Sequence, residues 1–144
     1  MDKPTFTEGD IVNAILNAVD LRINSEPHKI TIKRAGFSFE IQGVNEDNVA
    51  RAQKLSTKNR GRRNEETDWQ RYAAHLIYFA TVDDDKARIW DNRDVWQALN
   101  AVNGADVIYK CLTPAERADI VSIIEKISGY DDGNVSVDDF IQKK

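Results

Sequence analysis

The stretch Leu112–Tyr130, LTPAERADIVSIIEKISGY, carries the signals of a helix in the order in which a helix uses them. Thr113 can accept a hydrogen bond from the first turn and Glu116 can reach back to it, which makes a capping box. Pro114 falls at the first helical position, where its missing N–H group costs nothing, and Gly129 supplies a left-handed stop. Four isoleucines share one face: Ile120, Ile123, Ile124 and Ile127. The stretch therefore predicts an amphipathic helix that packs by its isoleucine face.

Upstream of this helix the hydrophobic pattern changes its period. Apolar residues at helical spacing predict a first helix over Thr7–Ile23, and they are Ile11, Val12, Ile15, Leu16, Val19 and Ile23. Phe6, before the cap, can form a hydrophobic staple with Ile11. The pattern then alternates with period two in Ile30–Ile32 and Phe37–Ile41, which predicts an antiparallel β-hairpin over about 29–42. Because a lone hairpin is marginally stable, its apolar face must lie on helices.

The middle of the chain consists of helical patterns separated by polar segments. We expect helices to begin at three capping positions: Asn45, Thr67 or Asp68, and Asp91 or Asn92. Asp83–Asp85 is expected to be a polar break between two helices. Gly104 is expected to end the helix that begins at Asp91 or Asn92. The residues expected to face inward from that helix are Val95, Trp96, Leu99 and Val102. Val107–Leu112 should form a short helix that leads into the last one.

Together these segments predict a mainly helical α+β domain over residues 1–130. About five helices should carry the small antiparallel β-hairpin packed on them. Residues 57–66 contain no aliphatic or aromatic side chain and are predicted to form a basic, flexible loop. Residues 131–144 should form a C-terminal tail that docks or frays.

The composition is that of an ordinary soluble protein. Of the 144 residues, 41% are hydrophobic and 31% are charged, and the net charge of −4 argues against a general nucleic-acid binder. The single cysteine, Cys111, excludes an intrachain disulfide framework and fits a reducing cytoplasm. Because no apolar run approaches the roughly 18 residues of a membrane-spanning helix, we expect neither a membrane anchor nor a secretory signal.

A catalytic or metal site has little support in the sequence. The two histidines are His28, in a turn, and His75, among apolar helix residues, so they make no His/Cys set at zinc spacing. Residues 131–140 resemble a calcium loop, but placing Gly133 at its sixth position puts Ser128 where an acidic ligand belongs. We therefore expect a protein that is not an enzyme and that needs no metal or cofactor.

One run of positive charge interrupts an otherwise acidic chain. Its six basic residues, with no acid between Asn48 and Asn64, are Arg51, Lys54, Lys58, Arg60, Arg62 and Arg63. Such a run is a solvated surface, a contact for a protein partner or a second copy of the chain, or a contact for RNA. RNA sites usually add stacking aromatic residues, and none lies within this run. Nucleic acid is therefore the least favoured of the three interpretations.

The helix expected over 67–82 is apolar nearly all round at its C-terminal end, which includes Ile77 and Tyr78. Either this helix is central in the fold, which is the simpler interpretation, or part of it forms a groove for a partner. The candidate partner-binding residues are therefore the six basic residues together with Ile77 and Tyr78.

From about Lys29 to Asp131 the order of these features resembles the tail assembly chaperones of long-tailed bacteriophages and their prophage relatives. In that family an apolar hairpin precedes an acid-opened helix, a basic segment, an aromatic-rich helix and a last helix with a Leu-x-x-x-Glu start and an Ile-x-Gly-aromatic-Asp finish. The corresponding segments here are Ile30–Ile41, Asn45–Asn59, Lys58–Arg63, Trp69–Ala80, Leu112–Glu116 and Ile127–Asp131. The chain departs from the family at Thr81–Asp83, where relatives often carry Pro-Asp-Leu.

This resemblance implies a chaperone that acts in the cytoplasm of the host bacterium during viral tail morphogenesis. It implies binding of the tape measure protein, which the chaperone keeps soluble until tail tube protein polymerises around it, and absence from the mature virion. Self-association and contact with the tail tube protein are further implied partnerships. Two alternatives remain: a small regulatory or RNA-contacting protein that uses residues 51–63, and a structural tail or connector component.

Overall fold

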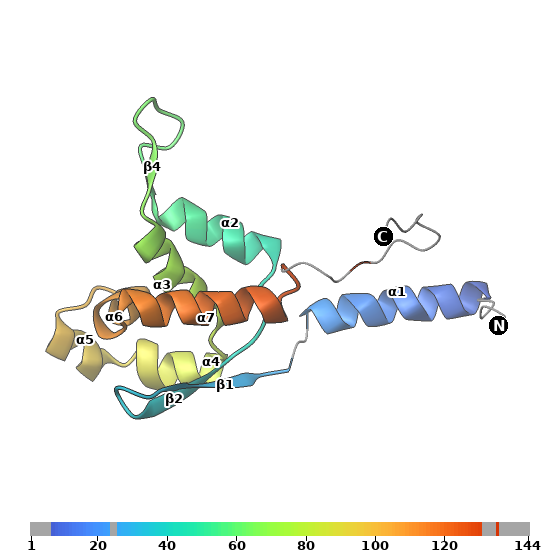
Figure 1. Ribbon diagram of the computed structural model, residues 1–144, viewed down its shortest axis with the longest axis horizontal. Helices are drawn as coiled ribbons and strands as arrows, with labels where there is room; N and C mark the ends of the chain where they lie inside the picture. The colour runs from blue at the N-terminus through green and yellow to red at the C-terminus, as the bar shows by residue number, and fades with distance from the viewer. Residues whose placement is uncertain (1–6, 24–25, 131–134, 136–144) are drawn as a thin grey trace, which may run out of the picture.

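The computed structural model describes residues 7–23, 26–130 and 135. Within these residues the chain forms seven α-helices, one π-helical turn and two short antiparallel strand pairs (Figure 1). The elements in chain order are α1 Glu8–Ile23, β1 His28–Ile32, β2 Phe37–Ile41, α2 Glu46–Leu55, β3 Thr57–Lys58, β4 Glu66–Thr67, α3 Trp69–Ala80, α4 Asp83–Asp85, η1 Lys86–Trp90, α5 Arg93–Leu99, α6 Gly104–Cys111 and α7 Pro114–Ile127. The mainly helical α+β class is confirmed, whereas the expected number of about five helices is too low.

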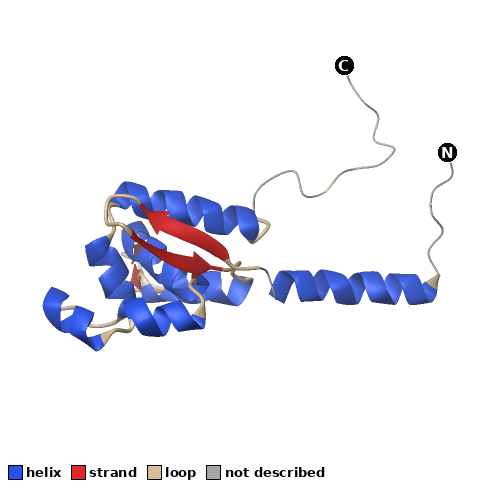
Figure 2. Cartoon of the chain, turned by 90° about the horizontal axis from the view of Figure 1, so that it is seen from below, coloured by secondary structure: helices blue, strands red, loops and turns tan. Residues whose placement is uncertain are grey.

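Helix α3 is the centre of the helical body, where it packs against α2, α6 and α7. Its residues Ala74, Leu76 and Ile77 are buried, and α7 contributes the buried Ile120 and Ile124 to the same core. This central position explains why the C-terminal end of α3 is apolar nearly all round. Figure 2 shows β1 and β2 lying side by side across the helices.

The predicted hairpin has one buried face. Strand β1 pairs with β2 in the register Ile30↔Phe39 and Ile32↔Phe37. The side chains of Ile30, Ile32 and Phe39 are buried, and the Phe39 ring packs edge-on against Trp90 with 5.1 Å between ring centroids. The alternation of buried and exposed residues is the one that the period-two pattern predicts.

Helix α7 has the cap that its sequence predicts. The Thr113 hydroxyl accepts the Glu116 N–H at 3.1 Å, and the Glu116 carboxylate accepts the Thr113 N–H at 2.9 Å. The carboxylate also accepts two hydrogen bonds from Arg34 in the hairpin turn, at 2.9 and 3.0 Å, which lower the pKa of Glu116 to about 2. At the other end of α7, the Ser128 hydroxyl accepts the Val44 N–H at 2.9 Å. Both ends of α7 are thus tied to the hairpin segment.

The three aspartates expected to be a polar break instead form α4, which continues into η1. Asp85 is buried and accepts hydrogen bonds from Arg88 at 2.9 Å and from the Glu40 N–H at 2.7 Å. Burial alone would raise the pKa of Asp85, but these two hydrogen bonds lower it. The π-helical turn places Trp90 in the core, where its indole N–H donates to the Thr81 hydroxyl at 3.0 Å. The predicted break at Asp83–Asp85 was wrong, because an aspartate whose carboxylate is satisfied by hydrogen bonds can lie within a helix.

The region around α5 corrects two further expectations. Helix α5 has no buried residue, and Val102, which was expected to face inward, is 77% exposed. Asn100, with a left-handed φ of 55°, ends α5. Gly104 does not stop that helix but begins α6, where a Cβ atom would lie 2.5 Å from the Tyr78 ring. Close approach of a neighbouring ring therefore requires glycine here.

Helix α1 forms as the sequence predicts and extends away from the helical body (Figures 1 and 2). Phe6, the expected staple residue, lies outside the described residues. So does the tail over 131–144, apart from Val135, which is exposed.

Candidate partner-binding surfaces

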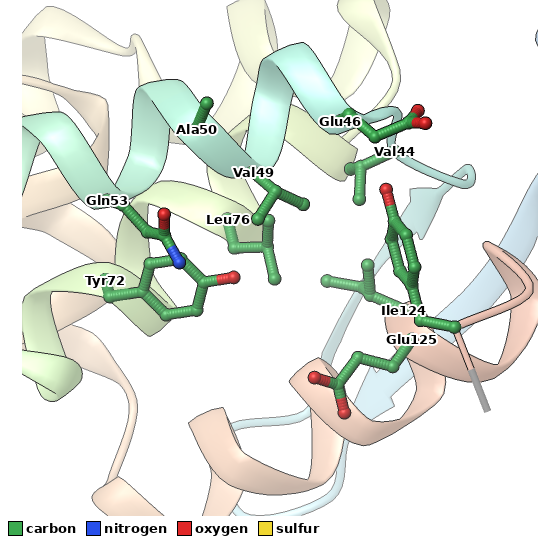
Figure 3. A pocket seen from close by; sticks show the side chains of 10 residues that line it. Val44, Glu46, Val49, Ala50, Gln53, Tyr72, Leu76, Ile124 and Glu125 are labelled. Carbon is green, nitrogen blue, oxygen red and sulfur yellow. The ribbon is translucent and has the colours of Figure 1, made fainter.

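A groove with a volume of about 290 Å³ lies between α2 and α7. Figure 3 shows Val49, Leu76 and Ile124 pointing into this space from α2, α3 and α7. The lining residues are Val44, Glu46, Val49, Ala50, Gln53, Tyr72, Leu76, Ile124, Glu125 and Tyr130. Because the floor is apolar and two walls are helices, the groove suits the apolar face of an amphipathic helix.

The walls of the groove carry acidic and aromatic side chains. Glu46 belongs to α2 and Glu125 to α7, so each wall contributes one carboxylate. Burial raises the pKa of Tyr72, and the nearby Glu125 and Tyr130 raise it further. Carboxylates beside an apolar floor favour a ligand with basic residues next to its apolar stripe.

The aromatic surface continues beyond the groove to Trp69. The Trp69 ring packs edge-on against Tyr72, with 5.4 Å between ring centroids, and Trp69 is 60% exposed. Lys58 and Trp69 also line a second hollow, at the base of the β3–β4 hairpin. The groove therefore runs along α2 from Glu46, in the first turn, toward the basic residues that follow α2.

The basic run is divided between α2 and a hairpin arm formed by β3 and β4, which projects from the body (Figure 1). The Thr57 and Thr67 hydroxyls lie 2.8 Å apart within this arm, and the Gly61 N–H donates to the Glu65 carboxylate at 2.8 Å. The segment expected to be a basic, flexible loop is a hydrogen-bonded hairpin in this structure, and Asn59 and Gly61 in its turn have left-handed backbone angles.

The six basic candidates lie in two places, on helix α2 and on the hairpin arm. Arg51 lies over the Phe79 ring, at 5.3 Å from its centroid, and it shares α2 with Lys54. The other four occupy the arm: Lys58, Arg60, Arg62 and Arg63. All six side chains are exposed, so each is accessible to a partner.

The two apolar candidates have structural roles. Ile77 is fully buried in the core, so it cannot contact a partner in this fold, and its inclusion among the candidate contacts was wrong. Tyr78 is half-buried, and its hydroxyl donates to the Asp91 carboxylate at 2.8 and 3.1 Å. Burial first, and then the hydrogen bond to Asp91, raise the pKa of Tyr78 to about 12.

Helix α1 presents a second apolar surface. Its five exposed apolar residues, each between 48% and 62% exposed, are Ile11, Val12, Ile15, Leu16 and Val19. The sequence predicts this stripe from its helical spacing, whereas the groove between α2 and α7 was not predicted. The thin apolar stripe of α2, which includes Val49, was the one sequence signal that this side of the body is incompletely covered.

A broader apolar hollow of about 520 Å³ lies between β2, η1, α5 and α6. Phe37, Trp90 and Val107 contribute to it, and so does Cys111, where burial raises the pKa of the thiol. Arg88, which also lines this hollow, already forms an ion pair with Asp85. The groove between α2 and α7 therefore offers the clearer combination of apolar floor and charged walls.

The described residues contain no group of three or more His, Cys, Asp or Glu side chains placed to hold a metal ion. His75 is half-buried, and its pKa is lowered by burial and by Arg71. Over the same described part of the chain, none of the helices combines the length and the apolar character that crossing a membrane would require.

Comparison with known proteins identifies a family. The family model of the phage XkdN-like tail assembly chaperone protein matches residues 12–141. No curated protein and no solved structure matches the chain. Because the family match covers most of the chain, the protein belongs to this family of phage tail assembly chaperones, and the resemblance seen in the sequence is confirmed.

Proposed function

We propose that this family member binds the tape measure protein of its phage and keeps it soluble until tail tube subunits enclose it. Membership of the family supports the general role in tail assembly. The observation that supports the choice of client is the apolar groove between α2 and α7, which Tyr72 and Trp69 extend.

The chemistry of the groove suits a long helical client. A helical chain that exposes apolar stripes before the tube encloses it aggregates through those stripes. The groove offers an apolar floor for such a stripe, and Glu46 and Glu125 offer charge to basic residues on either side of it.

The small size of the groove also suits a client that must be released. A volume of about 290 Å³ holds only a few side chains, so one copy makes one modest contact. Several copies along the client would together hold it firmly, yet each contact could yield to the tail tube protein.

Co-expression with the tape measure protein of the same genome tests the proposal. The chaperone should move the client into the soluble fraction in a complex with several copies of this chain. Ala50→Trp should abolish this effect, because Ala50 is exposed on the groove wall and a large ring there fills the groove without entering the core. Leu55→Trp is the matched control, since Leu55 lies exposed on the same helix outside the groove.

Two outcomes would contradict the proposal. If the tape measure protein stays insoluble in the presence of excess chaperone, this chain does not keep it soluble. Recovery of this chain from purified virions would favour a structural tail component instead.

Contact with RNA is a second candidate function, and one observation favours it. The exposed residues Trp69 and Lys58 line the same hollow at the base of the basic arm, and sites for single-stranded RNA combine aromatic stacking with positive charge in this way. Binding of a single-stranded RNA probe that weakens steeply as salt rises would support this function. We expect little binding at physiological salt.

A further inference from the structure

The apolar side of α1 is open to solvent and is bordered by acids. The exposed residues of this stripe are Ile11, Val12, Ile15, Leu16 and Val19. Over residues 8–20, where its side chains are described, α1 carries three acids and no lysine, arginine or histidine. Glu8 precedes Val12 by four positions, and Asp20 follows Leu16 by four. Helical spacing therefore places an acid at each end of the apolar stripe.

The groove between α2 and α7 combines an apolar surface with acids in the same way. Its lining includes Glu46 and Glu125 and no basic residue. Because like charges repel, the acidic α1 is a poor occupant for this groove. Both surfaces instead suit the same third partner, which is an amphipathic helix with lysines or arginines beside its apolar stripe.

We propose that α1 is a second binding site for a basic amphipathic helix, and that α1 and the groove hold two stretches of one client chain. The class of helix follows from the charges and apolar residues of the two surfaces. That the client is the tape measure protein rests on the proposed function.

The connection between the two sites favours binding of one client by both. Four residues, 24–27, separate the end of α1 from the start of β1, so α1 remains close to the body. The helix extends away from the body (Figure 1), which leaves its stripe accessible along its length. Once one stretch of a client is bound, the second site therefore meets the next stretch at a high effective concentration.

Each site alone is small. One face of a helix of 16 residues, about 24 Å long, buries less than the roughly 800 Å² per partner of a standard interface. The groove of about 290 Å³ likewise holds only a few side chains. Two such contacts on one chain strengthen binding without a tight site, and each can open separately when another protein displaces the client.

Synthetic helical peptides test the class of ligand without any phage protein. The probe is a peptide with a leucine stripe bordered by lysines, and the matched control has the same stripe bordered by glutamates. Isothermal titration of the full chain should show two sites for the lysine peptide and affinities about tenfold weaker or less for the glutamate peptide. Equal binding of the two peptides would overturn the proposal.

A tandem peptide tests whether the two sites act together. Two lysine-bordered stripes joined by glycine-serine linkers of graded length should bind one chain at least about tenfold more tightly than a single stripe at the best length. An affinity that equals that of the single stripe at every length would overturn joint binding.

Variants assign the sites to the two surfaces. Leu16→Asp should remove one of the two sites for the single peptide, and Ala50→Trp should remove the other. Asn17→Asp adds the same charge on the opposite side of α1 and should keep both sites. Circular dichroism checks the fold of each variant, and Leu16→Gln, which keeps a good helix former, should weaken the same site as Leu16→Asp. Two sites of unchanged affinity in both Leu16 variants would overturn the proposal.

Two further outcomes separate this proposal from its rivals. If Leu16→Asp lowers the mass seen by light scattering but leaves peptide binding unchanged, a second copy covers α1 and the proposal is wrong. A tape measure protein that wild type and Leu16→Asp solubilise equally would contradict the role of α1 alone. Peptide binding at both sites beside an insoluble tape measure protein would contradict the proposed function alone.

Discussion

Replacement of Gly104 by alanine should destabilise this protein, although alanine is the better helix former. Gly104 is the first residue of α6, and a Cβ atom there would lie 2.5 Å from the Tyr78 ring and 2.7 Å from a carboxylate oxygen of Asp91. Neither neighbour can move independently, because the Tyr78 hydroxyl donates to Asp91 at 2.8 Å. The added methyl group must therefore displace a linked pair of side chains.

Two opposing effects set the magnitude of the change. A Gly→Ala substitution restricts the unfolded chain and favours folding by about 0.4–1 kcal/mol. Forcing an extra carbon into a packed site typically costs about 1–3 kcal/mol. We expect the steric effect to dominate at Gly104, with a net loss of about 1–2 kcal/mol in the free energy of unfolding.

Denaturant unfolding of Gly104→Ala and of a matched control, Gly9→Ala, measures this difference. A Cβ at Gly9 would meet only the Thr7 hydroxyl, at an ordinary contact distance of 3.8 Å, so the control should lose no stability. The pKa of Tyr78, about 12 in the folded protein, should fall toward 10 in Gly104→Ala if the ring leaves Asp91, as measured by ultraviolet titration. A variant as stable as the wild type, with the tyrosine titration unchanged, would refute this reasoning.

Three further predictions concern the cap, the core and the arm. Because Arg34 lowers the pKa of Glu116 from 4.5 to about 2, the carboxylate stabilises the fold above pH 4.5 and this contribution is lost as the pH falls toward 2. Glu116→Gln should therefore flatten the pH dependence of the thermal midpoint in that window, and an unchanged slope would contradict the pairing. Arg117→Ala should cost about 2–4 kcal/mol in a denaturant melt, because the buried guanidinium donates to the Tyr109 and Leu112 carbonyls, at 2.8 and 2.6 Å. Arg117→Met keeps the side-chain volume and should cost less, so equal losses would show that the hydrogen bonds carry the whole effect. Limited trypsin digestion should cut first at the exposed Arg60, Arg62 or Arg63, and a first cut elsewhere would mean that the arm is docked.

Features that depend on neighbours in the sequence could be predicted. The capping box of Thr113 and Glu116, the proline after it and the left-handed Gly129 all act within one or two helical turns. The hairpin could be predicted for a similar reason, because the alternation of Ile30, Ile32, Phe37 and Phe39 defines its buried face.

Features that depend on tertiary partners could not be predicted. Arg88, three residues after Asp85, is a local partner of its carboxylate, but the Glu40 N–H that also satisfies this buried group lies 45 positions away, and no local signal records that contact. Gly104 was taken for a helix stop because the sequence does not show the Tyr78 ring beside it.

The candidate surfaces show the same limit. Periodicity identifies an apolar face, as it did for α1, but it cannot show whether another element covers that face. The groove combines α2, α3 and α7, so its existence depends on how three helices pack. Trp69 begins α3 and is 60% exposed, although its helical spacing does not distinguish it from the buried residues of the same helix.

The two ties between α7 and the hairpin segment set the order in which the chain can fold. Arg34 and Glu116 are separated by 82 positions, and Val44 and Ser128 by 84. Closing loops of this length is slow relative to forming a local helix, because chain entropy is lost before the contact stabilises the structure. During synthesis α1 can form as soon as it emerges, whereas the apolar face of the hairpin must wait for almost the whole domain. The body of this protein therefore completes its core only after α7 has left the ribosome.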